Sequence, residues 1–178
     1  MTELETERLQ LEPLVRAHAV ELFELLSDEC LYRFIPQDPF PTREALAARY
    51  RRLETRASSD GKEVWLNWAV RLKSSGACIG RVEATVRQDL SAQLAYELGV
   101  PHWGKGCATE ACRRVLRMLF EEFGVMEVVA EVDTRNLASI RLLDRLGFQR
   151  GALKENADVF KGSSSDEWRY LLPRPTLP

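Results

Sequence analysis

The sequence HWGKGCATEA, residues 102–111, joins a predicted strand to a predicted helix and decides the fold. Its two glycines, Gly104 and Gly106, let the backbone turn tightly and approach a ligand closely. The free N–H groups of the first helical turn, together with the helix dipole, favour a bound phosphate or pyrophosphate. Lys105 adds a positive charge beside them. The loop therefore predicts a pyrophosphate site, with a simple strand-to-helix turn as the alternative.

This loop matches neither of the two common phosphate-binding motifs. A Walker A loop needs a Gly-Lys pair followed by serine or threonine, and here Lys105 is followed by Gly106. A dinucleotide fingerprint needs a complete GxGxxG that opens a βαβ unit, and the loop has neither feature. The loop is thus neither a Walker A loop nor a dinucleotide-binding fingerprint.

Length and composition set the broad class of the protein. The chain has 178 residues, of which 45% are hydrophobic and 29% are charged, which is typical of one soluble domain. No run of about 18 apolar residues is present, and the acidic N-terminus lacks an apolar segment, so we expect a cytoplasmic protein. A net charge of -2 argues against nucleic acid and membrane surfaces as partners.

The residues that commonly bind metals are few and scattered. They are Cys30, Cys78, Cys107, Cys112, His18 and His102. No two cysteines form a CxxC pair, and the histidines are far apart, so we expect no metal site. Free thiols are the simplest interpretation of the four cysteines.

Hydrophobic periodicity predicts one mixed α/β domain. Strands are predicted at 8–13, 65–73, 77–87, 92–100, 125–132, 148–159 and 167–172. Helices are predicted at 17–28, from the cap Thr42 to the break at 58–61, at 108–123 and at 136–146. The three prolines of 33–41 indicate a loop. We expect the domain to span 1–172 and the proline-containing tail 173–178 to be frayed.

These features resemble the GNAT acetyltransferase superfamily. Its signature is [Q/R]-x-x-G-x-[G/A], and Gly106 and Ala108 fill the last two places. Trp103 stands where glutamine or arginine is usual. That substitution is common in a RimJ/RimL-like branch, which resembles ribosomal-protein N-terminal acetyltransferases and whose loop often reads WGKGxATEA.

Other segments resemble the same branch along nearly the whole chain. Residues 6–11 resemble its opening strand, and residues 135–148 resemble its N-x-x-S-x-R-x-x-x-x-x-G-F helix. Gly162, Asp166 and Tyr170 fit its last strands. The matches occur in the family's order, so chance similarity is a poor explanation.

The resemblance implies a single α/β (α+β) domain. Its sheet is twisted, mostly antiparallel and made of about seven strands, with about four flanking helices. Two central strands, here 92–100 and 126–134, splay apart into a V. Acetyl-CoA, a co-substrate, enters this wedge with its pyrophosphate on the loop. Proteins of this family are often dimers, so the resemblance is compatible with a homodimer. Nothing in the sequence specifies an interface.

The resemblance also implies a set of residues that bind acetyl-CoA. They are Leu98, Gly99, Val100, Trp103, Gly104, Lys105, Gly106, Cys107, Ala108, Thr109, Asn136, Ser139 and Arg141. Backbone N–H groups within 98–100 would stabilise the oxyanion of the reaction. Asn136 would cap its helix and contact the pantetheine arm. Arg141 either pairs with a phosphate or lies on a solvated face, and Cys107 is a poor candidate for an acylated nucleophile because direct transfer needs none.

Two residues are candidates for the proton transfers. Glu97 lies on the strand that leads into the loop and is a candidate base, with a rim glutamate held by an arginine as the alternative. Many relatives have a tyrosine that acts as the general acid at the position where this chain has Leu143. In the resembled branch a serine serves instead, and Ser139 matches it. A packing serine on the helix surface is the alternative.

The acceptor is the least specified part of the reaction. The loop 33–41 and the second helix would roof its cleft, with Phe34, Trp68 and Tyr96 as candidate lining residues, although strand aromatics commonly pack in the core. The resemblance implies an N-acetyltransferase that moves an acetyl group directly to a primary amine, such as the N-terminal α-amine of a ribosomal protein or peptide. The alternatives are an acetyltransferase for a small amine (antibiotic, polyamine or amino acid) and a CoA-binding sensor without catalysis.

Overall fold

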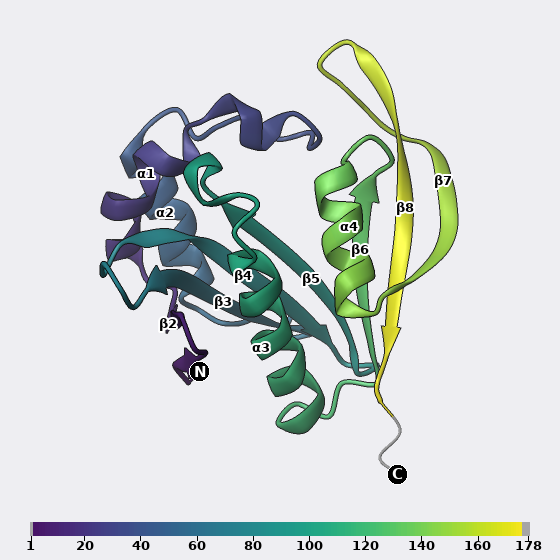
Figure 1. Cartoon of the computed structure of the whole chain (residues 1–178), viewed down its shortest axis with the longest axis horizontal. Coiled ribbons are helices and arrows are strands. Elements are labelled where there is room, and N and C mark those ends of the chain that lie inside the picture. The colour runs from purple at the N-terminus through teal and green to yellow at the C-terminus, as the bar shows by residue number, and fades with distance from the viewer. Residues whose placement is uncertain (1, 176–178) are drawn as a thin grey trace.

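The computed structural model describes residues 2–175, and these form one eight-stranded sheet with helices on both faces (Figure 1). The strands are β1 (Leu4–Glu5), β2 (Leu9–Pro13), β3 (Glu63–Leu72), β4 (Cys78–Arg87), β5 (Ser91–Leu98), β6 (Glu127–Asp133), β7 (Gln149–Phe160) and β8 (Ser163–Pro173). The α-helices are α1 (Ala19–Leu26), α2 (Arg43–Leu53), α3 (Cys107–Glu121) and α4 (Leu137–Leu146). Short 3-10 helices are η1 (Arg16–His18), η2 (Glu29–Tyr32) and η3 (Val100–His102).

The sheet has the order β1-β2-β3-β4-β5-β6-β8-β7, and β5 and β6 are its one parallel pair. These two central strands pair only where Ser91–Gln93 lies beside Glu127–Val129. Beyond that point they diverge, as Figure 1 shows, while β6 stays paired with β8 along its whole length. The predicted V-shaped splay of a mostly antiparallel sheet is confirmed.

Each face of the sheet carries its own hydrophobic cluster. The larger cluster contains residues of α3 and α4 with one side of β3, β4 and β5, and the smaller one contains residues of α1 and α2. Side chains of a strand alternate between faces, so neighbouring residues of β5 point into different layers. This alternation separates the two halves of the site described below.

Local signals in the sequence set the helix ends. Thr42 caps α2 by accepting a hydrogen bond from the Ala45 N–H at 3.1 Å, and Asn136 caps α4 through the Ser139 N–H at 3.1 Å. Gly147 ends α4 in the left-handed region at φ 88°, which favours glycine. Both predicted N-caps and the predicted end of α4 are confirmed.

The C-terminal hairpin differs from its prediction. β8 begins at Ser163 rather than near 167, because the hairpin of β7 and β8 extends beyond the core, where its residues are mostly exposed and show no apolar alternation. The tail predicted to fray at 173–178 begins with the last residue of β8, and the Arg174 N–H donates to the Met126 carbonyl at 2.8 Å. Residues 176–178 lie outside the described residues.

Candidate active site

The open edge of β5 presents backbone groups to the splay. The Gly99 N–H donates to the Ile79 carbonyl at 3.0 Å, so Gly99 is bonded to the neighbouring strand. In an antiparallel ladder the adjacent residue then points its N–H and carbonyl the other way, and Leu98 is that residue, paired with Gly80. The Leu98 N–H therefore faces the side of β5 from which β6 has diverged.

The loop after β5 has the backbone of an anion-binding helix start. Gly104 and Gly106 both lie in the left-handed region, at φ 71° and 78°. The Glu110 N–H donates to the Gly106 carbonyl at 3.0 Å and makes the first turn of α3. The preceding N–H groups, from Cys107 to Thr109, are those that a helix start leaves for a ligand.

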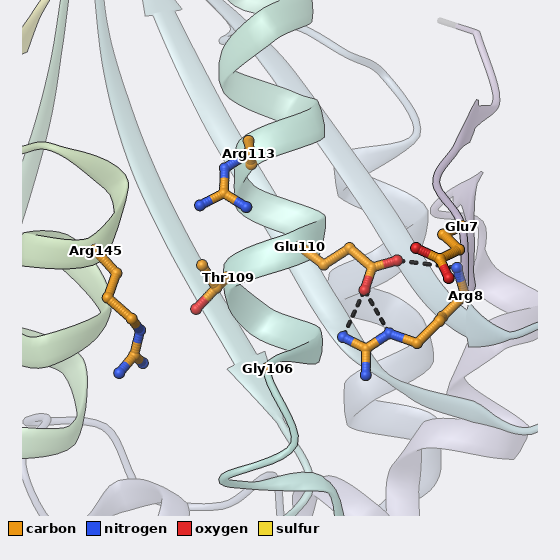
Figure 2. A pocket seen from close by; sticks show the side chains of 7 residues that line it. All are labelled: Glu7, Arg8, Gly106, Thr109, Glu110, Arg113 and Arg145. Atoms are coloured by element: carbon orange, nitrogen blue, oxygen red, sulfur yellow. Dashed lines mark hydrogen bonds and ion pairs between the residues drawn. The ribbon is translucent and has the colours of Figure 1, made fainter.

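An ion pair ties this loop to the first strands. The Arg8 Nε donates to Glu110 Oε2 at 2.6 Å (Figure 2). Nη1 of the same guanidinium donates to the Lys105 carbonyl at 3.0 Å. Thr6 Oγ1 also donates to Glu110, at 2.5 Å. Burial raises the pKa of Glu110, but the hydrogen bonds from Thr6 and Arg8 outweigh it and hold the pKa below its ordinary value. The carboxylate at the helix start is thus neutralised by Arg8.

The other predicted loop residues differ in exposure. Trp103 is 48% exposed, and its indole Nε1 donates to the Leu98 carbonyl at 2.6 Å, which holds the loop against the end of β5. Lys105 is exposed, whereas Cys107 is 3% exposed and packs in the core. A packed thiol agrees with direct transfer better than with an acylated cysteine.

On the face that carries α3 and α4, two predicted residues meet. The hydroxyl of Tyr96 lies 2.6 Å from Oγ of Ser139. Burial is the main factor that raises the pKa of Tyr96, so the phenol stays protonated at neutral pH and can donate to Ser139. Ser139 lies in the first turn of α4 and is only half-buried.

On the opposite face, Glu97 belongs to an ionic cluster. Arg81 Nε and Nη2 donate to the two oxygens of Glu97 at 3.0 and 3.1 Å, and Nη1 donates to Glu83 Oε2 at 2.6 Å. The Arg81 side chain is only 11% exposed. Nearby, the buried hydroxyl of Tyr50 in α2 has no hydrogen-bond partner among the described residues. A rim glutamate held by an arginine was the alternative for Glu97, and the structure has that pairing.

The proposed aromatic lining of the acceptor cleft needs correction. Trp68 is 1% exposed and packs in the larger core cluster, so it cannot line a cleft. Tyr96 faces the α3 and α4 side and not the side of α1 and α2, because it alternates with Glu97 along β5. Phe34 lies half-buried in the loop between α1 and α2, with the Arg33 guanidinium 5.1 Å from its ring centroid.

The loop that contains Phe34 is joined to the hairpin of β7 and β8. Lys161, in the hairpin turn, donates to the carbonyls of Tyr32 and Ile35, the latter at 3.3 Å, and lies 3.4 Å from the Gln37 carbonyl. Two segments more than a hundred residues apart in the sequence thus meet at the open end of the splay (Figure 1).

A pocket of about 410 Å³ lies beside the start of α3. Its lining residues are Glu7, Arg8, Gly106, Thr109, Glu110, Arg113 and Arg145 (Figure 2). Arg113 and Arg145 were not among the predicted site residues. The position of Arg113, seven residues after Gly106 on the same helix, was the available signal. Arg141, which was predicted, is exposed and does not line this pocket.

Comparison with known proteins decides the family. The family described as Acetyltransferase (GNAT) domain matches residues 8–149. The chain belongs to this family. The chain is 28% identical over 174 residues to an uncharacterized N-acetyltransferase, p20, of Bacillus licheniformis, a match that covers 97% of this chain and 96% of the relative.

Solved structures share the fold of this GNAT protein. A GNAT-family acetyltransferase of Bacillus anthracis has a TM-score of 0.83 at 19% identity and covers 97% of this chain and 99% of its own. The ribosomal-protein-S5-alanine acetyltransferase of Vibrio fischeri has a TM-score of 0.86 at 19% identity, with coverage of 98% and 97%. The GNAT fold uses acetyl-CoA, and the chain is an acyltransferase.

No helix within residues 2–175 is long and apolar enough to cross a membrane. The same residues contain no group of three or more histidine, cysteine, aspartate or glutamate side chains arranged to hold a metal ion.

Proposed function

We propose that this GNAT protein moves an acetyl group from acetyl-CoA directly to a primary amine, and that the acceptor is the N-terminal α-amine of a protein or peptide. The proposal depends chiefly on one observation at the splay. Tyr96 and Glu97 are neighbours on β5 but point to opposite faces. Tyr96 is hydrogen-bonded to Ser139, whereas Glu97 pairs with Arg81, which also binds Glu83. The strand that borders the splay thus offers donor chemistry on one face and amine chemistry on the other.

The side of the site that would bind acetyl-CoA has backbone N–H groups suited to a pyrophosphate. Two left-handed glycines, Gly104 and Gly106, and the N–H groups of the first turn of α3 would hold the pyrophosphate. Asn136 is occupied as a helix cap, and its contact with the pantetheine arm remains a prediction. Lys105 would add charge at the exposed rim of the loop.

The leaving thiolate needs a proton, and Ser139 is the proposed source. Transfer forms the bond from amine nitrogen to acetyl carbon and breaks the bond from that carbon to sulfur. The nitrogen gives up a proton to Glu97 or water, and the sulfur takes up a proton from Ser139, whose hydroxyl regains one from solvent. If Tyr96 donates to Ser139 Oγ, the serine hydroxyl hydrogen is free to point at the sulfur. Tyr96 is then a positioning residue, which acts through Ser139.

The oxyanion needs a donor, and the Leu98 N–H is the proposed one. Gly99 is engaged with Ile79, whereas the Leu98 N–H faces the open side of β5. A fixed backbone N–H in a water-poor wedge stabilises developing negative charge without reorganisation. Among 98–100, Leu98 is therefore our candidate.

The cluster around Glu97 favours an amine that needs only mild assistance. Two carboxylates, Glu97 and Glu83, face one guanidinium, so the cluster has surplus negative charge for an ammonium group. Both oxygens of Glu97 accept from Arg81, and Glu97 would assist the amine directly or through a water. An α-amine, with a pKa near 8, suits such a site better than a lysine amine near 10.4.

An acceptor screen tests the proposal. Peptides with a free N-terminus, the same peptides blocked at the N-terminus but with a free lysine, and a panel of small amines would be compared by thiol release and mass spectrometry. We expect acetylation of the free N-termini. Preferential acetylation of the small amines would favour the small-molecule alternative. Binding of acetyl-CoA without transfer to any amine would favour the sensor.

A further inference from the structure

A leucine from α1 fills the space that a side chain of Gly99 would occupy. Gly99 is buried directly after β5, and its φ of -56° is one that other residues also adopt. A Cβ added there would overlap Cγ and Cδ1 of Leu25 and would lie 2.9 Å from its Cδ2. The absence of a side chain at Gly99 therefore serves the close approach of Leu25 and not a special backbone conformation.

Leu25 lies on the face of β5 to which Glu97 points. Side chains alternate along a strand, so residues 97 and 99 share one face while Tyr96 and Leu98 share the other. Leu25 itself packs against the smaller hydrophobic cluster of α1 and α2. Its side chain thus covers the chain one residue beyond Leu98, whose N–H is the proposed oxyanion donor.

The packing and the polar contacts of α1 fix the position of Leu25. Its helix neighbours Leu22 and Leu26 are 0% and 3% exposed. Glu21, in the first turn, accepts hydrogen bonds from Arg71 of β3 at 2.7 and 3.0 Å. Leu25 itself is only half-buried, so it forms a wall that a ligand can reach rather than a part of the enclosed core.

The planar geometry of a thioester directs its acyl chain toward this wall. The carbonyl carbon has three substituents in one plane: the oxygen, the sulfur and the acyl chain. If the oxygen accepts from the Leu98 N–H and the sulfur lies at Ser139, the oxygen points at β5 and the sulfur at the face that carries α4. The acyl chain then points to the opposite face, where Leu25 lies against Gly99.

We propose that Leu25 is a specificity-determining residue that limits the transferred acyl group to the size of acetyl. A longer acyl chain has to displace the Leu25 methyl groups, which the close packing around α1 opposes. The inference rests on the proposed function, because it uses the Leu98 N–H and Ser139 as the two contacts of the thioester. It deepens that function by assigning the choice of acyl group to a helix on the acceptor side.

A comparison of acetyl-CoA, propionyl-CoA and butyryl-CoA tests this role of Leu25. Their affinities would be measured by calorimetric titration, and their transfer by thiol release with the free peptides of the acceptor screen. We expect the unmodified protein to prefer acetyl-CoA. Leu25→Ala should raise the ratio of propionyl-CoA to acetyl-CoA use about ten-fold, the scale of one methylene in an apolar pocket. Leu31→Ala, at another half-buried leucine against the same cluster, is the matched control and should leave the ratio unchanged.

A second substitution rebuilds the wall from the strand side. Leu25→Ala combined with Gly99→Ala returns a methyl group to the space that Leu25 occupied, so the ratio should return toward that of the unmodified protein. A general loss of stability lowers the use of all three acyl-CoA molecules alike. The ratio therefore separates selectivity from folding.

Three results would overturn the inference: an unchanged ratio in Leu25→Ala by both measurements, an equal change in Leu31→Ala, or a ratio that the added Gly99→Ala leaves raised. The titrations test the role of Leu25 even when no amine is acetylated, because they need only binding. The expected selectivity in binding, without transfer to any amine, would support the role of Leu25 and contradict the proposed function alone. The two failures are therefore distinguishable.

Discussion

The hydroxyl of Tyr96 on β5 lies 2.6 Å from Oγ of Ser139 on α4, although 43 positions separate the two residues. Relatives often have a tyrosine that acts as the general acid at the position of Leu143. In this chain the Leu143 side chain is buried. A phenol is nevertheless present beside the proposed acid, and it comes from the splayed strand. Burial raises the pKa of Tyr96, which keeps its proton available to Ser139.

Removal of either hydroxyl should affect turnover more than donor binding. Ser139→Ala removes the proposed acid, and we expect kcat to fall about a hundred-fold, within the range for general acids. Tyr96→Phe should lower kcat less, because the serine remains but loses its orientation. Steady-state kinetics with varied acetyl-CoA would separate kcat from KM. Tyr50→Phe is the control, since it removes another buried hydroxyl that has no partner among the described residues. Unchanged kcat in Ser139→Ala would remove this residue from the mechanism.

The left-handed glycine at the start of α3 should matter for the donor. Gly106→Ala forces a side chain to φ 78° and should cost about 1 kcal/mol of stability. Acetyl-CoA should raise the melting temperature of the unmodified protein, because it binds the native state, and this shift should shrink in the variant. Gly162→Ala is matched, with φ 77° and no heavy atom within 4 Å of the added Cβ. The control should lose similar stability and keep the full shift; an equal loss of the shift would argue against a role for the loop.

The link between the loop 33–41 and the C-terminal hairpin should matter for the acceptor. Lys161→Gln removes the ammonium group that donates to the carbonyls of Tyr32 and Ile35. We expect KM for a peptide acceptor to rise several-fold, on the scale of one or two charge-assisted hydrogen bonds, while affinity for acetyl-CoA is unchanged. Lys154→Gln, exposed on the same hairpin, is the control. A change in acetyl-CoA affinity alone would assign the link to the donor side.

Acid should weaken the ion pairs that join β2 to β3. The hydrogen bonds from Arg71 to Glu12, at 2.9 and 3.1 Å, are the largest factor that lowers the pKa of Glu12 below its ordinary 4.5. A lowered pKa stabilises the folded state above the ordinary pKa, and this contribution is lost as pH falls through the folded-state value.

Glu12→Gln should therefore lower stability at neutral pH and reduce the further loss on acidification. Urea unfolding at about pH 7 and about pH 3 measures both effects. Glu3→Gln, at an exposed carboxylate, is the control. An unchanged pH dependence in Glu12→Gln would mean that other carboxylates carry it.

Local chemistry made most of the fold predictable. Thr42, Asn136 and Gly147 mark helix ends because their side chains or backbone freedom act within a few residues. Apolar periodicity marked most strands, and it was least informative at the tip of the hairpin from 160 to 166, where few side chains are buried. The loop at 102–111 was identifiable for the same reason, since its glycines and helix start are adjacent in sequence.

The acceptor half of the site was harder to predict. Trp68 was grouped with Tyr96 as a cleft residue, but a strand aromatic lines a surface only where no helix covers it, and the core cluster buries Trp68. The pairing of Glu97 with Arg81 depends on the register of β4 against β5. A carboxylate on a strand does not reveal by itself which cation faces it.

The sequence by itself determined the family, the glycine-containing loop at 102–111 and the helix caps, because these depend on residues close together in the chain. Tertiary structure alone decided that Tyr96 meets Ser139, that Arg81 holds Glu97, and that Arg113 and Arg145 line one pocket. Those contacts join distant segments through strand register and helix packing. Both are set by burial of the whole core rather than by any local pattern.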